Sequence, residues 1–159
     1  MAVKRIALVI LAATLSAAAT TARADFSKES TPPASPPAAT LDAAKAKTDA
    51  GDFRGAIPIL TALVQQQPNN PDALNLMGYS LRKTGQTALA LQYYNKALAL
   101  NPKHLGANEY LGELYVEQGQ MDKAKERLAV LVAACGSCAQ EQDLSKAIAT
   151  GVPNAKKSW

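Results

Sequence analysis

The sequence predicts an all-α solenoid of three stacked helical hairpins closed by a capping helix. Three glycines, Gly51, Gly85 and Gly119, recur at intervals of 34 residues, and series of alanines and prolines keep the same interval. These alanines and prolines are Ala56, Ala90, Ala124, Pro68 and Pro102. A period of this length is typical of helix–turn–helix units, each of which buries its apolar face against the next unit.

The N-terminus has the three parts of a bacterial export signal. Lys4 and Arg5 precede the apolar stretch 6–19, and the small-x-small sequence Ala-Arg-Ala ends at Ala24. This order predicts a signal peptide over 1–24 that is cleaved near Ala24. The apolar stretch is shorter than the roughly 20 residues that a membrane-spanning helix needs. We therefore expect a periplasmic or secreted protein with no membrane span after cleavage.

Removal of the signal peptide nearly neutralises the chain. The whole sequence has 17 Lys and Arg against 13 Asp and Glu, a net charge of +4. Three of the basic residues, Lys4, Arg5 and Arg23, belong to the signal peptide, so the mature chain keeps 14 basic residues and a net charge of +1. Binding to nucleic acid or to an anionic membrane surface needs a sustained basic face. We expect no nucleic-acid partner.

A proline-rich linker, 25–39, precedes the folded domain, which we place at 40–150. Two Pro-Pro pairs stand among Ser, Thr and Ala residues, a composition that favours an extended, disordered spacer. A ligand for a proline-recognition domain is the alternative interpretation.

The middle hairpin carries the clearest helix signals. Asn70 is suited to a helix cap, and Pro71 to the first helical position. The inward positions of the two helices follow helical spacing and are Leu74, Met77, Gly78, Leu81, Ala90, Leu91, Tyr94, Ala97 and Leu98. Gly78 inside a helix costs about 1 kcal/mol relative to Ala, so we expect a neighbouring helix to approach closely there.

The flanking hairpins repeat this pattern less completely. In the first, Lys47 stands at a usually apolar position, and Pro58 lies inside the second helix, expected from Arg54 to Gln66 with local irregularity. The third has its own inward series, Leu111, Gly112, Tyr115, Ala124, Leu128 and Leu131. Gly136 stands where a proline is expected. A capping helix over 139–150 would bury Leu144, Ala147 and Ile148 against the last hairpin and leave the tail 151–159.

These positions resemble the tetratricopeptide repeat (TPR), with units at about 37–70, 71–104 and 105–138. Counted from Pro71, the key positions of the family fall on Leu74, Met77, Gly78, Leu81, Ala90, Tyr94, Ala97 and Pro102. The resemblance implies a non-enzymatic scaffold without a cofactor, which binds a protein or peptide along its concave face. Because export is predicted, we expect this partner in the cell envelope.

The resemblance also implies which side chains face the partner, because the first helix of each hairpin lines the concave face. These residues are Lys45, Asp49, Asn75, Tyr79, Arg82, Lys83, Glu109, Tyr110, Glu113 and Glu117. An ordinary solvated face would also be polar, but Tyr79 and Tyr110 favour a contact surface. Glu109, Glu113 and Glu117 repel one another at i+4 spacing, so we expect them either to be solvated or to face a basic ligand.

The only two cysteines, Cys135 and Cys138, form a Cys-Gly-Ser-Cys motif between the third hairpin and the capping helix. Covalent haem attachment would need His after the second cysteine, where residue 139 is Ala, and a structural zinc site would need about four ligands. A disulfide and a redox-active or copper-binding dithiol remain. Export favours the structural disulfide, and thiol-redox or copper handling is the alternative function. The arrangement is similar to small exported bacterial repeat proteins in which CxxC precedes a Leu-x-x-Ala-Ile helix.

Catalytic motifs are absent from the sequence. It has one histidine, His104, which follows Pro102 and suits a helix cap or surface role. No GxSxG, HExxH or phosphate-binding glycine-rich loop occurs. We therefore expect neither an enzyme nor a metal site.

Overall fold

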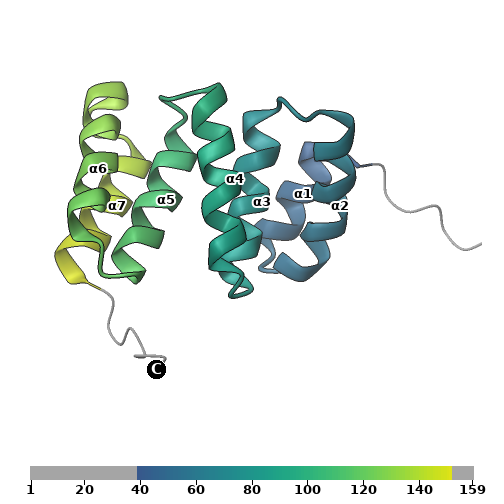
Figure 1. Cartoon of the computed structure of the whole chain (residues 1–159), viewed down its shortest axis with the longest axis horizontal. Helices are drawn as coiled ribbons and strands as arrows, with labels where there is room; N and C mark the ends of the chain where they lie inside the picture. Colours follow the sequence, from purple (N-terminus) through teal and green to yellow (C-terminus); the bar gives the residue numbers. More distant parts are fainter. Residues whose placement is uncertain (1–38, 152–159) are drawn as a thin grey trace, which may run out of the picture. The chain divides into compact units, whose positions relative to one another are not determined.

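The computed structural model describes residues 39–151, which form seven α-helices and no strand (Figure 1). The helices are α1 (Leu41–Asp49), α2 (Phe53–Gln66), α3 (Pro71–Lys83), α4 (Thr87–Leu100), α5 (Leu105–Glu117), α6 (Met121–Cys135) and α7 (Ala139–Thr150). The predicted signal peptide 1–24, the linker 25–39 except its last residue, and the tail beyond Gly151 lie outside the described residues.

The helices form three hairpins, α1–α2, α3–α4 and α5–α6, stacked in sequence order (Figure 1). Each first helix packs on the first helix of the next hairpin, so that α1 contacts α3 and α3 contacts α5. The last helix, α7, packs on both α5 and α6. The predicted all-α solenoid of three hairpins and a capping helix is thereby confirmed.

The glycines that recur at 34 residues end the first helix of each hairpin. Gly51, Gly85 and Gly119 have φ values of +75°, +83° and +72°, a left-handed conformation that glycine adopts without the steric cost of a Cβ. The N–H of the following residue bonds to a carbonyl five residues back, at 2.8–2.9 Å in all three turns. This pattern satisfies carbonyls that the helix end leaves open.

The second helix of the third hairpin ends differently from those of the first two, because no proline follows it. Pro68 and Pro102 disfavour helical geometry in the preceding residue, and Gln67 and Asn101 have left the helical region, with φ of −132° and −137°. In the third hairpin Gly136 replaces the proline, so α6 continues one residue further, to Cys135, before Gly136 ends it at φ +65°.

In the core, the ring of a buried tyrosine packs directly against a helical glycine. Tyr94 of α4 is fully buried, and a Cβ added to Gly78 of α3 would lie 2.6 Å from its ring. The space beside Gly112 of α5 is occupied in the same way by the side chain of Leu144 of α7. The close approach expected at Gly78 is confirmed, and Gly112 shows how the capping helix is seated.

The first hairpin contains the proline for which local irregularity was expected. Helix α2 runs without a break from Phe53 to Gln66 through Pro58. Pro58 is exposed, so the carbonyl that it leaves without a donor can be solvated.

Candidate functional site

The predicted partner-facing residues come from α1, α3 and α5, and we call the exposed sides of these helices and of α7 the first-helix face. The structure separates them by burial. Lys45, Asp49, Lys83 and Glu117 are exposed, Tyr79, Tyr110 and Glu113 are half-buried, and Asn75, Arg82 and Glu109 are buried. Lys45 and Asp49 form an exposed i,i+4 ion pair at 2.7 Å.

Three aromatic rings from three helices make one continuous row. Tyr79 of α3 stacks on Tyr110 of α5 with centroids 4.4 Å apart, and Phe53 of α2 meets the edge of Tyr79 at 5.3 Å. Burial raises the pKa of Tyr110 to about 12, with a smaller contribution from Glu109. Phe53 is not among the predicted contact residues, because no helical periodicity relates the first residue of α2 to Tyr79. We call Phe53, Tyr79 and Tyr110 the aromatic row.

Arg82 lies beside the aromatic row rather than on the surface. Its side chain is 3% exposed, and its guanidinium carbon is 5.8 Å and 5.9 Å from the centroids of Tyr79 and Tyr110. Nη2 donates a hydrogen bond to Glu113, and Nη1 lies 3.4 Å from Glu117. Burial would lower the pKa of Arg82, but these carboxylates, together with Tyr94, raise it instead.

The contacts of Arg82 show how the fold accommodates the negative charge of Glu109, Glu113 and Glu117, which helical spacing alone did not reveal. Two of them, Glu113 and Glu117, share the single guanidinium of Arg82 from the neighbouring hairpin, which offsets one of their two negative charges. Glu109 is buried, and burial together with Glu113 and Asp143 raises its pKa to about 8. This part of the first-helix face therefore holds more carboxyl groups than cations.

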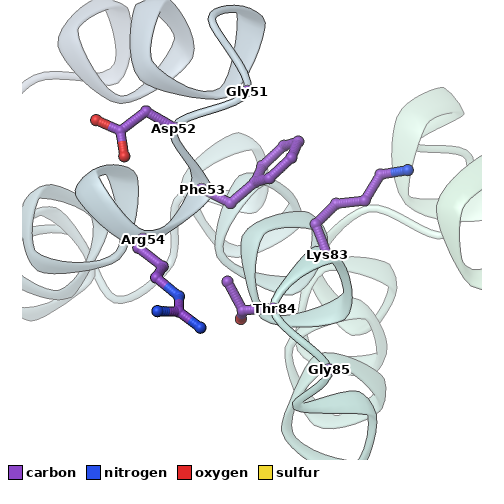
Figure 2. A pocket seen from close by; sticks show the side chains of 7 residues that line it. All are labelled: Gly51, Asp52, Phe53, Arg54, Lys83, Thr84 and Gly85. Atoms are coloured by element: carbon purple, nitrogen blue, oxygen red, sulfur yellow. The ribbon is translucent and has the colours of Figure 1, made fainter.

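Two hollows lie near the carboxyl ends of the first helices, and Phe53 of the aromatic row lines one of them. The first, of about 450 Å³, lies at the α1–α2 and α3–α4 turns and the helix ends beside them, and is lined by Gly51, Asp52, Phe53, Arg54, Lys83, Thr84 and Gly85 (Figure 2). The second, of about 260 Å³, lies at the carboxyl ends of α3, α5 and α7 and is lined by Arg82, Lys83, Glu113, Val116, Glu117, Ala147, Thr150 and Gly151. Lys83 belongs to both.

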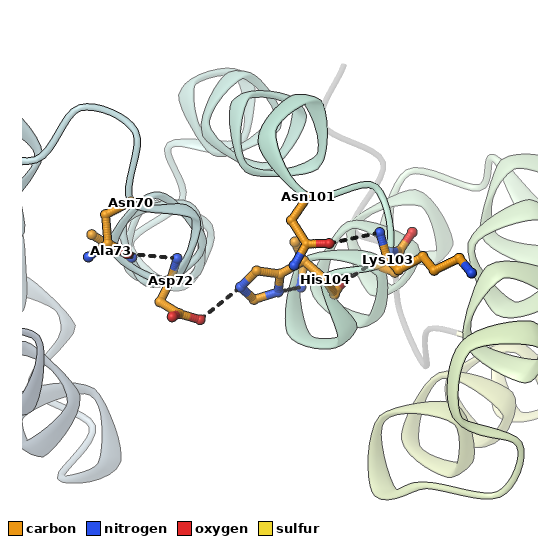
Figure 3. Close-up of polar contacts among 8 residues, drawn as sticks. Asn70, Asp72, Ala73, Asn101, Lys103 and His104 are labelled. Carbon is orange, nitrogen blue, oxygen red and sulfur yellow. Dashed lines mark hydrogen bonds and ion pairs between the residues drawn. The ribbon is translucent and has the colours of Figure 1, made fainter.

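His104 is a helix cap that also joins two hairpins. Its Nδ1 accepts the backbone N–H of Ala107 at 3.1 Å, and its Nε2 lies 3.0 Å from Asp72 of α3 (Figure 3). Accepting at Nδ1 leaves the proton on Nε2, which then donates to Asp72. Nδ1 thus caps the start of α5, and Nε2 ties that cap to α3.

The two cysteines are joined in a disulfide, with Cα atoms 5.7 Å apart. The bridge spans the turn between α6 and α7 and is partly exposed. Within residues 39–151, no group of three or more His, Cys, Asp or Glu side chains is arranged to hold a metal ion. Over the same part of the chain, no helix combines the length and apolar character required to cross a membrane.

Two family models described as tetratricopeptide repeat match residues 41–104 and 81–148. The human general transcription factor 3C polypeptide 3 is 36% identical over 89 residues. That match covers 55% of this chain but only 10% of the human protein, so the chain spans about a tenth of this relative's length.

Solved structures of similar fold include two that hold peptides. The first TPR domain of Spaghetti (RPAP3), bound to the HSP90 peptide SRMEEVD, has a TM-score of 0.59 at 18% identity and covers 69% of this chain and 90% of its own. The Yersinia enterocolitica type III secretion chaperone SycD, in complex with a peptide of the translocator YopD, has a TM-score of 0.59 at 16% identity. That match covers 69% of this chain and 84% of the chaperone. At such identities the likeness establishes the fold alone.

Proposed function

Because the chain belongs to the tetratricopeptide repeat family, we propose that it is a non-enzymatic scaffold that binds a protein or peptide across its first-helix face. We further propose that it acts in the bacterial periplasm or cell envelope. The TPR fold is one of protein–protein interaction, and two neighbours of this fold were solved with peptides bound.

The aromatic row is the observation that carries this proposal. Tyr79 and Tyr110 are half-buried and stacked among charged groups, and no side chain of residues 39–151 hydrogen-bonds their hydroxyls. Tyrosine offers a large contact area at little cost in conformational entropy, together with a polar group that binds backbone or side chains. Such rings at the centre of a polar face match the anchors found in protein interfaces.

Two observations support the proposed location. The basic and apolar N-terminus ending at Ala24 has the pattern of a cleaved signal. The Cys135–Cys138 disulfide fits an oxidising compartment, since cytosolic proteins keep their thiols reduced. N-terminal mass spectrometry of the exported protein should find Asp25 as the first residue, and a mature chain that retains Met1 would contradict export by cleavage.

In-cell crosslinking followed by capture tests the binding face. Tyr79→Leu combined with Tyr110→Leu keeps apolar bulk but removes the rings and hydroxyls, so it should abolish capture of the specific partner. Tyr93→Leu on α4 is the matched control, because Tyr93 is also half-buried but lies on a second helix. Arg82 is unsuitable for this test, since its loss would leave Glu113 without its cation. An unchanged set of captured proteins in the Tyr79/Tyr110 variant would refute the proposed face.

A further inference from the structure

Glu109 of α5 is a buried acidic residue without a partner in the described part of the chain. It is 7% exposed, yet no donor of residues 39–151 forms a hydrogen bond or an ion pair with its carboxyl group. Its carboxyl oxygens do not belong to the buried polar atoms that are cut off from solvent, which lie in Asn75, Ser80, Arg82 and Tyr94. The small exposed part of Glu109 therefore includes its carboxyl group, which reaches the surface.

The charged groups that act on Glu109 come from three helices. Glu113 lies one turn further along α5, Asp143 lies on α7, and Arg82 lies on α3. Arg82 is the one cation of the three, and Glu113 and Glu117 already share its guanidinium. Asp143 is exposed and forms no ion pair within residues 39–151. The carboxyl group of Glu109 is therefore left without a cation of its own.

The excess of negative charge remains when the neighbouring lysines are counted. Lys83 lies beside Glu113 and Glu117 as a second cation. Two cations then face four carboxyl groups, those of Glu109, Glu113, Glu117 and Asp143. Lys146 follows Asp143 by three residues on α7, and counting it as well still leaves more acids than bases. This part of the molecule is suited to a cationic group from outside.

The acidic group lies at the seam between α5 and α7, next to the aromatic row. Helix α7 packs on α5 with Leu144 beside Gly112 (Figure 1). Asp143 precedes Leu144, and Glu109 precedes Gly112 by about one turn, so the two acids face each other across this contact. Tyr110 follows Glu109 on α5, and burial, together with the charge of Glu109, raises the pKa of Tyr110. A side chain that pairs with Glu109 therefore has the ring of Tyr110 beside it.

A buried carboxyl group without a partner can avoid an uncompensated charge in two ways. It can hold a proton, and burial raises the pKa of Glu109 to about 8 in the chain alone. It can also pair with a cation from another molecule. A guanidinium is suited to this second role, because its planar fork of N–H donors binds carboxylates and stays charged over the whole pH range of a folded protein.

We propose that the seam between α5 and α7 binds an arginine side chain from a peptide segment of the partner protein, with its guanidinium at Glu109 and Asp143. Residues that flank this arginine pack on Tyr110. The proposal rests on the proposed binding function and adds the side chain that the partner presents. In the complex Glu109 is ionised, whereas the free chain holds a proton there below about pH 8. Binding therefore releases a proton.

Two peptides that differ by one charge test this proposal on the mature chain. The probe is a capped Leu-Arg-Leu peptide, and the matched peptide carries citrulline, which has the shape of arginine without its charge. In an NMR titration at pH 8, the arginine peptide should shift backbone signals of α5 and α7 around Glu109 and Asp143. It should bind at least about fivefold more tightly than the citrulline peptide.

The pH dependence of binding identifies the acid that pairs with the arginine. In the parent chain, affinity for the arginine peptide should rise between about pH 6 and 8, by up to about tenfold per pH unit, because one proton is released. Glu109→Gln keeps the size of the side chain but cannot ionise, so it should bind weakly at every pH. Asp143→Asn should weaken binding at pH 8 and move the rise to lower pH, because Glu109 loses a like charge. Glu126→Gln, at an exposed position of α6, is the control and should behave as the parent chain.

Three results would overturn the proposal. They are an arginine peptide that binds no more tightly than the citrulline peptide, signal shifts confined to helices other than α5 and α7, and a Glu109→Gln variant with the affinity and pH dependence of the parent chain. The binding function itself fails separately. If the Tyr79/Tyr110 variant loses its captured partner while Glu109→Gln and Asp143→Asn retain it, the first-helix face binds a partner but no arginine enters the seam.

Discussion

Gly78 and Tyr94 share one site in the core, where the absence of a side chain on α3 makes room for a ring on α4. The Tyr94 ring atoms come within 2.6–3.1 Å of where a Cβ on Gly78 would lie. Real Cβ atoms do not tolerate such contacts, and the fully buried ring has little space into which it can move.

We predict that Gly78→Ala destabilises the domain by about 1–3 kcal/mol through overpacking, despite a gain in helix propensity of about 1 kcal/mol. In Tyr94→Leu, which removes the ring, the same glycine substitution should cost much less. Urea unfolding of the four proteins in this double-mutant cycle measures the coupling. Additive effects would show that the ring does not limit the glycine.

A second prediction concerns Arg82, whose side chain is almost completely buried against Glu113. Arg82→Ala should lower the free energy of unfolding by roughly 3–5 kcal/mol, since a half-buried carboxylate loses its cation. Lys45→Ala removes a partner of the exposed Asp49 and should cost no more than about 1 kcal/mol. Equal costs in chemical denaturation would mean that Arg82 contributes no more than a surface ion pair.

Glu109 should make stability depend on pH. Its pKa is about 8 in the folded chain, against an ordinary value of 4.5, because it is buried near Glu113 and Asp143 with only Arg82 to offset them. The folded state therefore holds a proton that the unfolded state has released between these values. In that window stability falls as pH rises, by at most about 1.4 kcal/mol per pH unit.

Glu109→Gln should remove this slope, so that the variant gains stability over the parent chain as pH rises from about 5 to 8. Thermal unfolding across that range measures the difference, and Glu126→Gln at an exposed position of α6 serves as the control. A parent chain and a Glu109→Gln variant with parallel pH profiles would contradict the raised pKa.

At the scale of elements, the joint between α6 and α7 differs from every other connection in residues 39–151. Gly136 stands in place of the proline that follows α2 and α4, so α6 ends one residue later in the repeat, and the Cys135–Cys138 disulfide closes the turn. The capping helix then inserts Leu144 against Gly112. The disulfide and this contact together set where α7 lies on the last hairpin.

Reduction of the disulfide should lower the free energy of unfolding by about 2 kcal/mol, the loop-entropy value for so short a ring. The matched variant Cys135→Ser with Cys138→Ser should reproduce this loss without reductant. Thiol counting on natively exported protein and thermal unfolding before and after reduction are the measurements. A pair that cycles readily without changing stability would favour the thiol-redox or copper-handling interpretation instead.

At the scale of the whole domain, stability is expected to be graded along the stack, because each hairpin is supported only by its neighbours. Helix α3 packs on α1, α2, α4 and α5, whereas α1 and α7 lie at the two ends of the described stack. Contacts from both sides protect the middle helices from local opening.

Hydrogen exchange should therefore be slowest in α3, α4 and α5 and fastest in α1 and α7. Leu144→Ala, which empties the contact at Gly112, should speed exchange in α7 and the facing parts of α5 and α6 before it affects α3. Uniform acceleration across all helices would instead indicate a single cooperative unit. Val132→Ala is the control, because Val132 is exposed on α6.

Helix positions and hairpin order could be predicted from the sequence because they depend on local chemistry. Glycine at the left-handed turn positions, proline after the second helices and apolar residues at helical spacing each act within a few residues of where they stand. The close approach at Gly78 followed for the same reason, since an unfavourable helix residue calls for a packing explanation.

The character of the first-helix face depended on tertiary structure. Spacing placed Tyr79, Arg82 and Glu113 on one face, but it could not show that Arg82 is buried and bound to Glu113, or that Phe53 completes the aromatic row. Periodicity reports the direction of a side chain from its own helix, whereas burial and ion pairing depend on atoms from other helices. The sequence by itself determined the repeated helical scaffold, and only packing between hairpins decided which of its polar residues remain available to a partner.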